Sequence, residues 1–162
     1  MKLGTKLVNK VRARQNARKL LIQALYSLEV GGSDAAQIEE DCLAEKNMSK
    51  VDEKFFQTAL HAIAKDTKAI DTIYSKYLDR ENVELDPTSR AILRLTSYEM
   101  INHLDIPFKV VINEGVNLAK TYAPTDAFKF INGVLDELAI SSRSSEKTTV
   151  SYTHLTLPTN GT

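Results

Sequence analysis

A strip of cationic, amide and aromatic side chains runs along the amino-terminal part of the chain. At about 100° per residue in a helix, five side chains fall on one strip: Arg12, Gln15, Lys19, Gln23 and Tyr26. Cations of this kind bind phosphates, amides can read base edges, and a tyrosine ring can stack on an unpaired base. The alternative is a solvated helix face with Tyr26 at the edge of the core. The pattern indicates a candidate surface for single-stranded nucleic acid.

Positive charge gathers at the amino terminus, although the whole chain is neutral with 21 basic and 21 acidic residues. Seven basic residues precede the first acidic residue, Glu29: Lys2, Lys6, Lys10, Arg12, Arg14, Arg18 and Lys19. A local excess of one sign attracts polyanions whatever the total charge. Residues 1–11 carry charge without a sustained apolar period, so we predict a basic flexible arm there.

The sequence assembles no constellation for catalysis or metal binding. It contains neither a G-x-x-x-x-G-K-[ST] nor a G-x-G-x-x-G phosphate loop. Cys42 is the only cysteine, and His61 and His103 fall on different predicted elements, so no pair has metal-ligand spacing. Carboxylates interleave with lysines, as on a solvated helix face. We therefore expect no enzyme, no cofactor and no metal.

Composition indicates one globular domain. Of the 162 residues, 43% are hydrophobic and 26% charged, which is ordinary for a soluble protein. The longest apolar runs fall short of a membrane span. Asn9, Arg12 and Arg14 interrupt any apolar signal segment. The single thiol fits a reducing compartment, so we expect a cytoplasmic protein without membrane contact.

Helical periodicity accounts for most of the chain between residues 12 and 140. Asp86 and Pro87 mark one helix start as cap and first residue, and Gly31 with Gly32 marks a helix end. Near the carboxyl end, Asp105 can cap a helix that opens at Pro107. The six predicted helices lie near residues 12–30, 35–45, 55–78, 87–101, 107–122 and 127–139.

The last two of these helices resemble the signature of the NusB family of transcription antitermination factors. The likeness rests on the proline start and on the segment Lys-Phe-Ile-Asn-Gly-Val-Leu-Asp from Lys129 to Asp136. An A-L-Y motif ending at Tyr26 and an R-x-x-L-R-x-x-x-Y-E pattern from Arg90 to Glu99 are also similar to the family. The resemblance covers roughly residues 14–138.

The resemblance implies an all-α fold, a single domain of about six or seven helices forming a bundle of two packed three-helix subdomains. We expect this RNA-binding domain over residues 12–140 and a disordered tail over 141–162. Within the tail, Val150 to Pro158 looks like a translated sequencing-adaptor junction. Residues 150–162 are therefore expected to be non-native.

The resemblance also implies a role and partners. With NusE, a ribosomal protein of the small subunit, such a protein binds boxA RNA of ribosomal RNA leader transcripts and joins the RNA polymerase antitermination complex. The expected RNA contacts are Arg12, Arg14, Gln15, Arg18, Lys19, Gln23, Tyr26, Lys109, Lys120, Lys129, Phe130 and Asn132. The expected NusE contacts are Tyr74, Tyr77, Arg80, Glu84 and Ser89. Some relatives form homodimers, so the oligomeric state of the free protein stays open.

Two alternatives remain at this point. One is the similar RNA-binding domain at the amino end of some ribosomal RNA cytosine methyltransferases, which needs a following catalytic domain. The other is a helical protein-interaction module without RNA binding. An amino terminus rich in cations and free of acids favours RNA binding over the second alternative.

Overall fold

The computed structural model describes residues 2–45, 47–144 and 146, and within them the regular structure is helical. The elements are α1 (Lys2–Val30), α2 (Ala35–Glu45), η1 (Met48–Lys50), α3 (Glu53–Lys65), α4 (Thr67–Ser75), η2 (Asn82–Glu84), α5 (Pro87–Asn102), α6 (Phe108–Tyr122) and α7 (Ala127–Ser142), where η marks a short 3₁₀ helix. No strand occurs in these ranges. The predicted all-α fold is confirmed.

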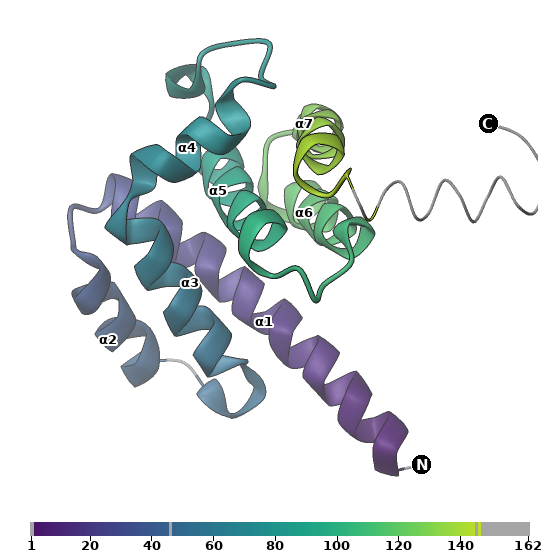
Figure 1. The fold of residues 1–162 in the computed structure, drawn as a ribbon. Coiled ribbons are helices and arrows are strands. Elements are labelled where there is room, and N and C mark those ends of the chain that lie inside the picture. Colours follow the sequence, from purple (N-terminus) through teal and green to yellow (C-terminus); the bar gives the residue numbers. More distant parts are fainter. Residues whose placement is uncertain (1, 46, 145, 147–162) are drawn as a thin grey trace, which may run out of the picture.

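Two groups of three helices pack together (Figure 1). α1 packs on α2, α3 and α5, while α6 and α7 pack on each other and on α5. The fourth helix, α4, joins the groups by packing on α5 and α7. This is the predicted bundle, with α5 in its centre and α1 running the length of the molecule (Figure 1).

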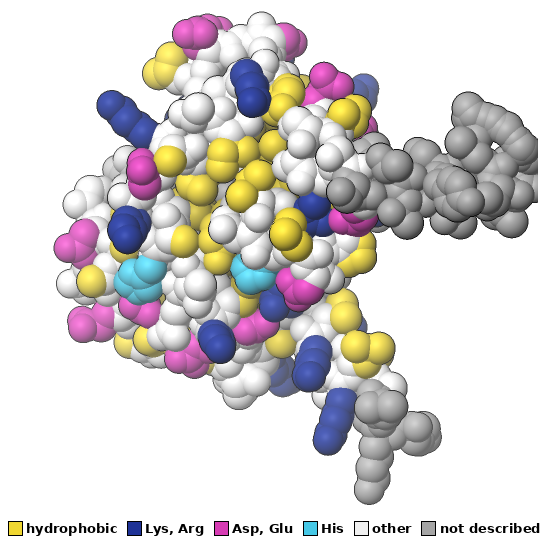
Figure 2. Space-filling model, in the orientation of Figure 1, with side chains coloured by type: hydrophobic (Ala, Val, Ile, Leu, Met, Phe, Trp, Pro, Cys, Tyr) yellow, Lys and Arg dark blue, Asp and Glu magenta, His cyan; other side chains and the backbone are white. Residues whose placement is uncertain are grey.

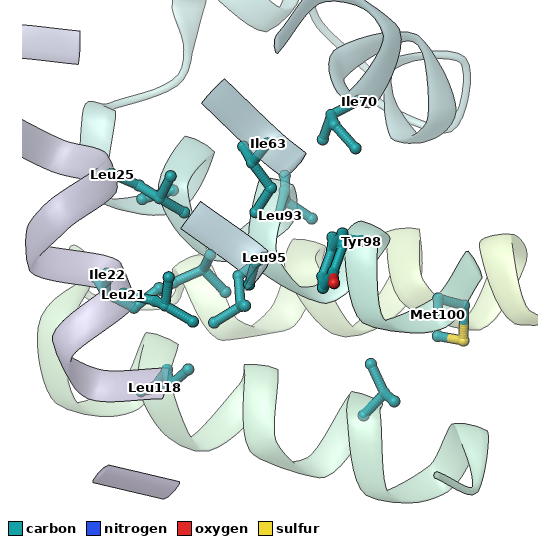
Figure 3. Packing of buried hydrophobic residues seen from close by; sticks show 14 of the residues in the cluster. Leu21, Ile22, Leu25, Ile63, Ile70, Leu93, Leu95, Tyr98, Met100 and Leu118 are labelled. Atoms are coloured by element: carbon teal, nitrogen blue, oxygen red, sulfur yellow. The ribbon is translucent and has the colours of Figure 1, made fainter. Parts of the chain in front are cut away.

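The core surrounds α5 because both groups bury their apolar stripes against it. Leu95 and Tyr98 of α5 lie in one cluster with Leu21 and Leu25 of α1 and Leu118 of α6 (Figure 3). In α5, nine of the ten residues from Arg90 to Glu99 are buried, and Arg94 is the exception. A helix buried on nearly all sides fixes the positions of the outer helices that carry the polar surfaces.

The first helix begins ten residues earlier than predicted, at Lys2 instead of Arg12. Residues 2–11 are therefore its first turns and do not form a separate arm in this structure. No proline interrupts them, and their lysines and leucines favour a helix once a packed segment has nucleated it. The side chains from residue 4 to residue 12 are exposed, so the few apolar residues of these turns, such as Leu7 and Val11, are not part of the core.

The predicted helix over 55–78 is wrong, because Asp66 divides it into α3 and α4. The backbone of Asp66 leaves the helical region with φ −148° and ψ 74°. Its side chain accepts a hydrogen bond from the Ala69 N–H at 3.1 Å. An aspartate that bonds a nearby backbone N–H competes with the continuing helix, so it ends one helix and caps the next.

The start of α5 is confirmed, whereas the predicted cap of α6 is wrong. Asp86 accepts from the Ser89 N–H at 2.9 Å, and Pro87 is the first residue of α5. At α6 the cap position is Pro107, which makes no side-chain cap bond. The Phe108 N–H donates to Glu146 Oε2 at 2.9 Å, so Asp105 does not cap α6.

The chain stays packed beyond residue 140. α7 continues to Ser142, and Arg143 is buried with its guanidinium donating to the carbonyls of Met100, His103 and Ile106. The predicted start of a tail at residue 141 is therefore wrong. The rest of that prediction, including residues 150–162, lies outside the described residues. Among the helices described, none has the length and apolar character to cross a membrane.

Candidate nucleic-acid interface

Most of the predicted strip lies on the outer face of α1. Arg12, Lys19, Gln23 and Tyr26 are exposed, and 42% of the Tyr26 surface is accessible, enough for a base to stack on its ring. Gln15 is half-buried and donates to Glu114 Oε2 on α6 at 2.9 Å. The strip is thereby fixed against α6.

The polar surface continues from α1 onto α6. A shallow recess of about 240 Å³ lies between the two helices. Gln15 and Lys19 line it from α1, and Asn117, Thr121 and Tyr122 line it from α6. The sequence analysis missed these three α6 residues, since only the packing of α6 against α1 brings them beside Lys19.

A second recess, of about 220 Å³, surrounds the hinge between α6 and α7. Lys120 and Phe128 line it, with Lys120 Nζ 5.0 Å from the centre of the Phe128 ring. Lys129 Nζ lies 6.0 Å from the same ring and 3.5 Å from Asp126 Oδ1. Both members of that ion pair are largely exposed, so Lys129 remains available to a phosphate.

The two recesses adjoin, because Asn117 and Lys120 are neighbours on the same face of α6. Together they form what we call the α1/α6/α7 surface, made of Lys19, Gln23, Tyr26, Asn117, Thr121, Tyr122, Lys120, Phe128 and Lys129. Lys109 and Asn132 are exposed on α6 and α7 and extend it. Most of the residues expected to bind RNA are thus exposed on these three helices, and Arg14, Gln15, Arg18 and Phe130 are the exceptions.

Arg18 belongs to the core and not to this surface. Its side chain donates to Glu99 at 2.7 and 2.9 Å, and Glu114 Oε1 lies 3.6 Å away. Burial disfavours the charged guanidinium, but Glu99 and Glu114 outweigh that effect and raise the pKa of Arg18. Because only 3% of Arg18 is exposed, the expected RNA contact is wrong. Arg18 instead joins α1 to α5 and α6.

Arg14 also faces away from the strip. Its Nε donates to Asp52 Oδ2 at 3.0 Å, and its guanidinium carbon lies 4.1 Å from the centre of the Phe55 ring. Both partners come from the start of α3. Arg14 therefore ties α1 to α3, and the structure does not bring it together with Lys19.

Phe130 lies on the opposite flank of α7 from Phe128. The guanidinium carbon of Arg80 stands 5.0 Å from the centre of its ring, so Phe130 faces the segment between α4 and η2. Two positions along a helix turn the side chain by about 200°. The structure therefore separates Phe130 from the α1/α6/α7 surface and puts Phe128 there in its place.

Two of the five residues expected to bind NusE are inaccessible. Tyr74 is fully buried, with its hydroxyl 2.7 Å from Asp71 Oδ1 and 2.8 Å from Asn82 Oδ1. Burial, followed by the hydrogen bond to Asp71, raises the pKa of Tyr74. Ser89 is buried inside the first turn of α5. A side chain without exposed surface offers a partner nothing to touch, so neither residue fits a direct contact.

The other three residues, which follow α4 in the chain, remain accessible. Arg80 and Glu84 are exposed, and the hydroxyl of half-buried Tyr77 is hydrogen-bonded to Ser141 of α7 at 2.7 Å. With Phe130 they form what we call the α4/α7 cluster: Tyr77, Arg80, Glu84 and Phe130. It is separate from the α1/α6/α7 surface.

A partly buried ionic network holds the segment that contains η2. Arg90 donates to Glu29 Oε2 at 2.6 Å and to the carbonyl of Asn82 in η2 at 2.6 Å. Arg94 donates to Glu29 and to Asp71 of α4. The hydrogen bond from Arg90 lowers the pKa of Glu29 despite partial burial. Arg90 and Arg94 thus fix the end of α1, η2 and α4 to α5.

No group of three or more His, Cys, Asp or Glu side chains that could hold a metal ion occurs in the part of the chain that the structure describes. Two carboxylates, Glu114 and Asp126, line the two recesses. The residues that make up the α1/α6/α7 surface carry ammonium, amide, hydroxyl and aromatic groups. These are suited to binding phosphates, base edges and base faces.

A family model and several named proteins are similar to this chain over most of its described residues. The model of the NusB family matches residues 15–139. The transcription antitermination protein NusB of Alcanivorax borkumensis is 42% identical over 134 residues, covering 83% of this chain and 89% of its own. The protein of that name from Pasteurella multocida is 44% identical over 130 residues, covering 80% and 90%.

The fold has a counterpart among solved structures. The structure of T. maritima NusB superposes with a TM-score of 0.73 at 28% sequence identity, covering 83% of this chain and 96% of that one. These comparisons confirm the resemblance seen in the sequence.

Proposed function

The chain belongs to the NusB family, and we propose that it acts in transcription antitermination by holding single-stranded RNA on the α1/α6/α7 surface. The relatives that it matches are named as transcription antitermination proteins. The proposed role requires no reaction and no cofactor.

The chemistry of the surface supports RNA as the ligand. Lys19, Lys120 and Lys129 are exposed cations that can each neutralise a phosphate. Tyr26 and Phe128 present rings on which unpaired bases can stack, at about 1–3 kcal/mol for each base. Gln23 and Asn117 offer amide groups for base edges. Paired bases would leave these rings without a partner, so we propose a single-stranded element such as boxA.

The α4/α7 cluster is the proposed contact for NusE. It is accessible, combines rings with a guanidinium, and lies apart from the RNA surface, so one molecule can hold both partners. Aromatic and arginine side chains are the residue types that contribute most to protein interfaces. The RNA-bound protein would then join the RNA polymerase antitermination complex through NusE.

The single observation that carries the proposal is the continuity of cations and rings from α1 across α6 to α7. A gel shift with a boxA-type RNA, with and without purified NusE and at two salt concentrations, tests it. We expect binding that NusE strengthens and salt weakens. The triple variant Lys19→Ala, Lys120→Ala, Lys129→Ala should lower the salt slope by about 0.7 for each lysine.

Lys65→Ala is the matched control, because Lys65 is an exposed lysine at the far end of α3. It should leave the affinity unchanged. Equal RNA affinity of the triple variant and the native protein would rule out the α1/α6/α7 surface. Loss of NusE binding in Phe130→Ala with RNA binding retained would support the separate partner site.

A further inference from the structure

The apolar stripe of α1 continues beyond the body of the molecule. Figure 1 shows the first turns of α1 projecting past the other helices. Leu7 and Val11 lie on the same line of the helix as Arg18, which faces the core. Their exposed fractions are 63% and 51%. An inward-facing stripe thus extends over two turns without anything packed on it.

A groove of about 580 Å³ lies at the foot of this projecting segment. Val11 lines it from α1, Val110 from the first turn of α6, and Ile106 from the preceding loop. Its remaining lining residues are Lys10, Ala13, Arg14, Arg18, Asp52 and Glu114. The three aliphatic side chains give the groove an apolar character suited to a partner's aliphatic side chain.

The charge around the groove is positive once its internal pairs are taken into account. Asp52 is paired with Arg14 at 3.0 Å. Glu114 is bonded to Gln15 and lies 3.6 Å from Arg18, but Arg18 is already paired with Glu99, so one carboxylate charge remains in this group. Lys6 and Lys10 are exposed and make no ion pair within the described residues. Figure 2 shows dark blue and yellow side chains side by side on these first turns. Lys6 and Lys10 outnumber the remaining carboxylate charge of Glu114, so the net charge is positive, and the two lysines lie next to the exposed apolar stripe.

Charge selects among the possible occupants. A second copy would bring another α1 that contains no acidic residue before Glu29, so the unpaired lysines would repel each other. RNA would find phosphate-binding lysines here but no accessible ring, because Phe55 is buried beneath Arg14. Carboxylates on a protein partner would complement Lys6 and Lys10, and its aliphatic side chains would fit the groove.

We propose that this groove, together with Leu7, Lys6 and Lys10, binds an acidic amphipathic segment of another protein. Its aliphatic side chains would pack between Val11 and Val110, and its carboxylates would face the two lysines. The groove faces about 100° around α1 from Lys19. It shares Glu114 with the recess between α1 and α6, but no residue of the α1/α6/α7 surface or of the α4/α7 cluster lines it. One molecule can therefore hold RNA and this partner together.

Fluorescence anisotropy with the full chain tests the proposal. The probe is a labelled amphipathic peptide of Glu, Leu and Ala that forms a helix with one acidic face. We expect saturable binding, weakened by about tenfold or more in Val11→Asp and in Val110→Asp. Val83→Asp is the matched control, because Val83 is 83% exposed in η2, and it should bind the peptide as the native protein does.

Circular dichroism checks that each variant is folded, which is expected because the substituted valines are exposed. A peptide with Lys in place of Glu should not bind. Three outcomes would overturn the proposal: no binding of the acidic peptide, equal binding by Val11→Asp, or self-association of the native protein that Val11→Asp abolishes. RNA binding by Val11→Asp should be retained, and its loss would make the groove part of the RNA site instead. The lysine triple variant tests the α1/α6/α7 surface, and its result has no bearing on whether the groove binds the peptide.

Discussion

At the scale of single residues, the Arg18–Glu99 pair decides how α1 is held. Both side chains are nearly or fully inaccessible, at 4% and 0% exposure. Taking two charges out of water is costly, and the cost is offset only while each charge keeps its partner. The pair therefore acts as a unit that fixes the angle of α1, and through it the position of Lys19 and Tyr26.

Removing one member of this pair should be far worse than removing both. We expect Arg18→Met and Glu99→Met each to lower the free energy of unfolding by about 3–5 kcal/mol, because a buried charge loses its partner. The double variant should lose much less free energy of unfolding than the two single variants lose together. Urea denaturation measures all three, with exposed Arg12→Met as a nearly neutral control. Additive losses would mean that the two charges are not coupled.

His103 makes stability depend on pH near neutrality. Burial, and then the positive charge of Arg14, lowers the pKa of His103 below its ordinary value of about 6.5. Its ring lies 3.2 Å from the Tyr98 hydroxyl and edge-on to Phe55. Around this pH the unfolded chain binds more protons than the folded one, so protonation favours unfolding.

We therefore expect the free energy of unfolding to fall as the pH decreases from about 7 to about 5.5. His103→Asn, which stays neutral and can still bond a hydroxyl, should show a weaker fall. The depressed pKa of Glu29 acts in a different window, below its ordinary value near 4.5. Urea titrations at several pH values separate the contribution of His103 from that of Glu29. If the free energy of unfolding depends on pH in the same way in the native protein and in His103→Asn, His103 is not the cause of that dependence.

At the scale of elements, α5, α6 and α7 approach closely at Gly115. A Cβ there would lie 2.8 Å from Thr96 Cγ2 and 3.1 Å from Leu135 Cδ1. Gly133 is also helical, but a Cβ on it would meet nothing within 4 Å. Substitution by alanine at Gly115 therefore tests close packing, whereas the same substitution at Gly133 tests helix propensity alone.

Gly115→Ala should destabilise the protein by about 1–3 kcal/mol, because the core would have to shift for the added methyl group. Gly133→Ala should instead stabilise it by about 0.5–1 kcal/mol, since alanine favours a helix. Thermal and urea unfolding measure both effects. A stabilising Gly115→Ala would show that the three helices can separate at no cost.

The sequence predicted helices best where local signals mark their ends. Asp86 with Pro87 and the glycines after Val30 marked such ends, and Pro124 follows the end of α6 by two residues. The start of α1 was missed because its first turns are rich in charged and polar residues and their few apolar residues, such as Leu7 and Val11, are exposed. Asp66 was missed because the apolar stripe continues on both sides of it, and only its cap bond to Ala69 reveals the break.

The candidate site was only partly predictable, for a geometric reason. Spacing within one helix placed Lys19, Gln23 and Tyr26 on one face, but it could not reveal that Arg18 would meet Glu99 across the bundle. The choice between Phe128 and Phe130 depends on how α7 is rotated against α4 and α6. Contacts between distant segments, such as Gln15 with Glu114, are set by packing and leave no periodic signal.

At the scale of the whole molecule, the net charge is zero, but the charges are distributed unevenly over separate surfaces. α1 brings its basic residues to one end, while α6 and α7 add lysines beside its outer face. The core network through Glu29, Arg90 and Arg94 fixes the opposite end, where the α4/α7 cluster lies. A rigid helical body can in this way present RNA and protein partners on different sides.

The central claim is that one surface spanning α1, α6 and the start of α7 holds the RNA. Mapping of backbone amide shifts by NMR during titration with a boxA-type RNA tests it most directly. We expect the largest shifts at Lys19, Gln23, Tyr26, Asn117, Thr121, Lys120, Phe128 and Lys129, with little change on α2 and α3. Shifts gathered on α2 and α3, or spread evenly over the molecule, would contradict it.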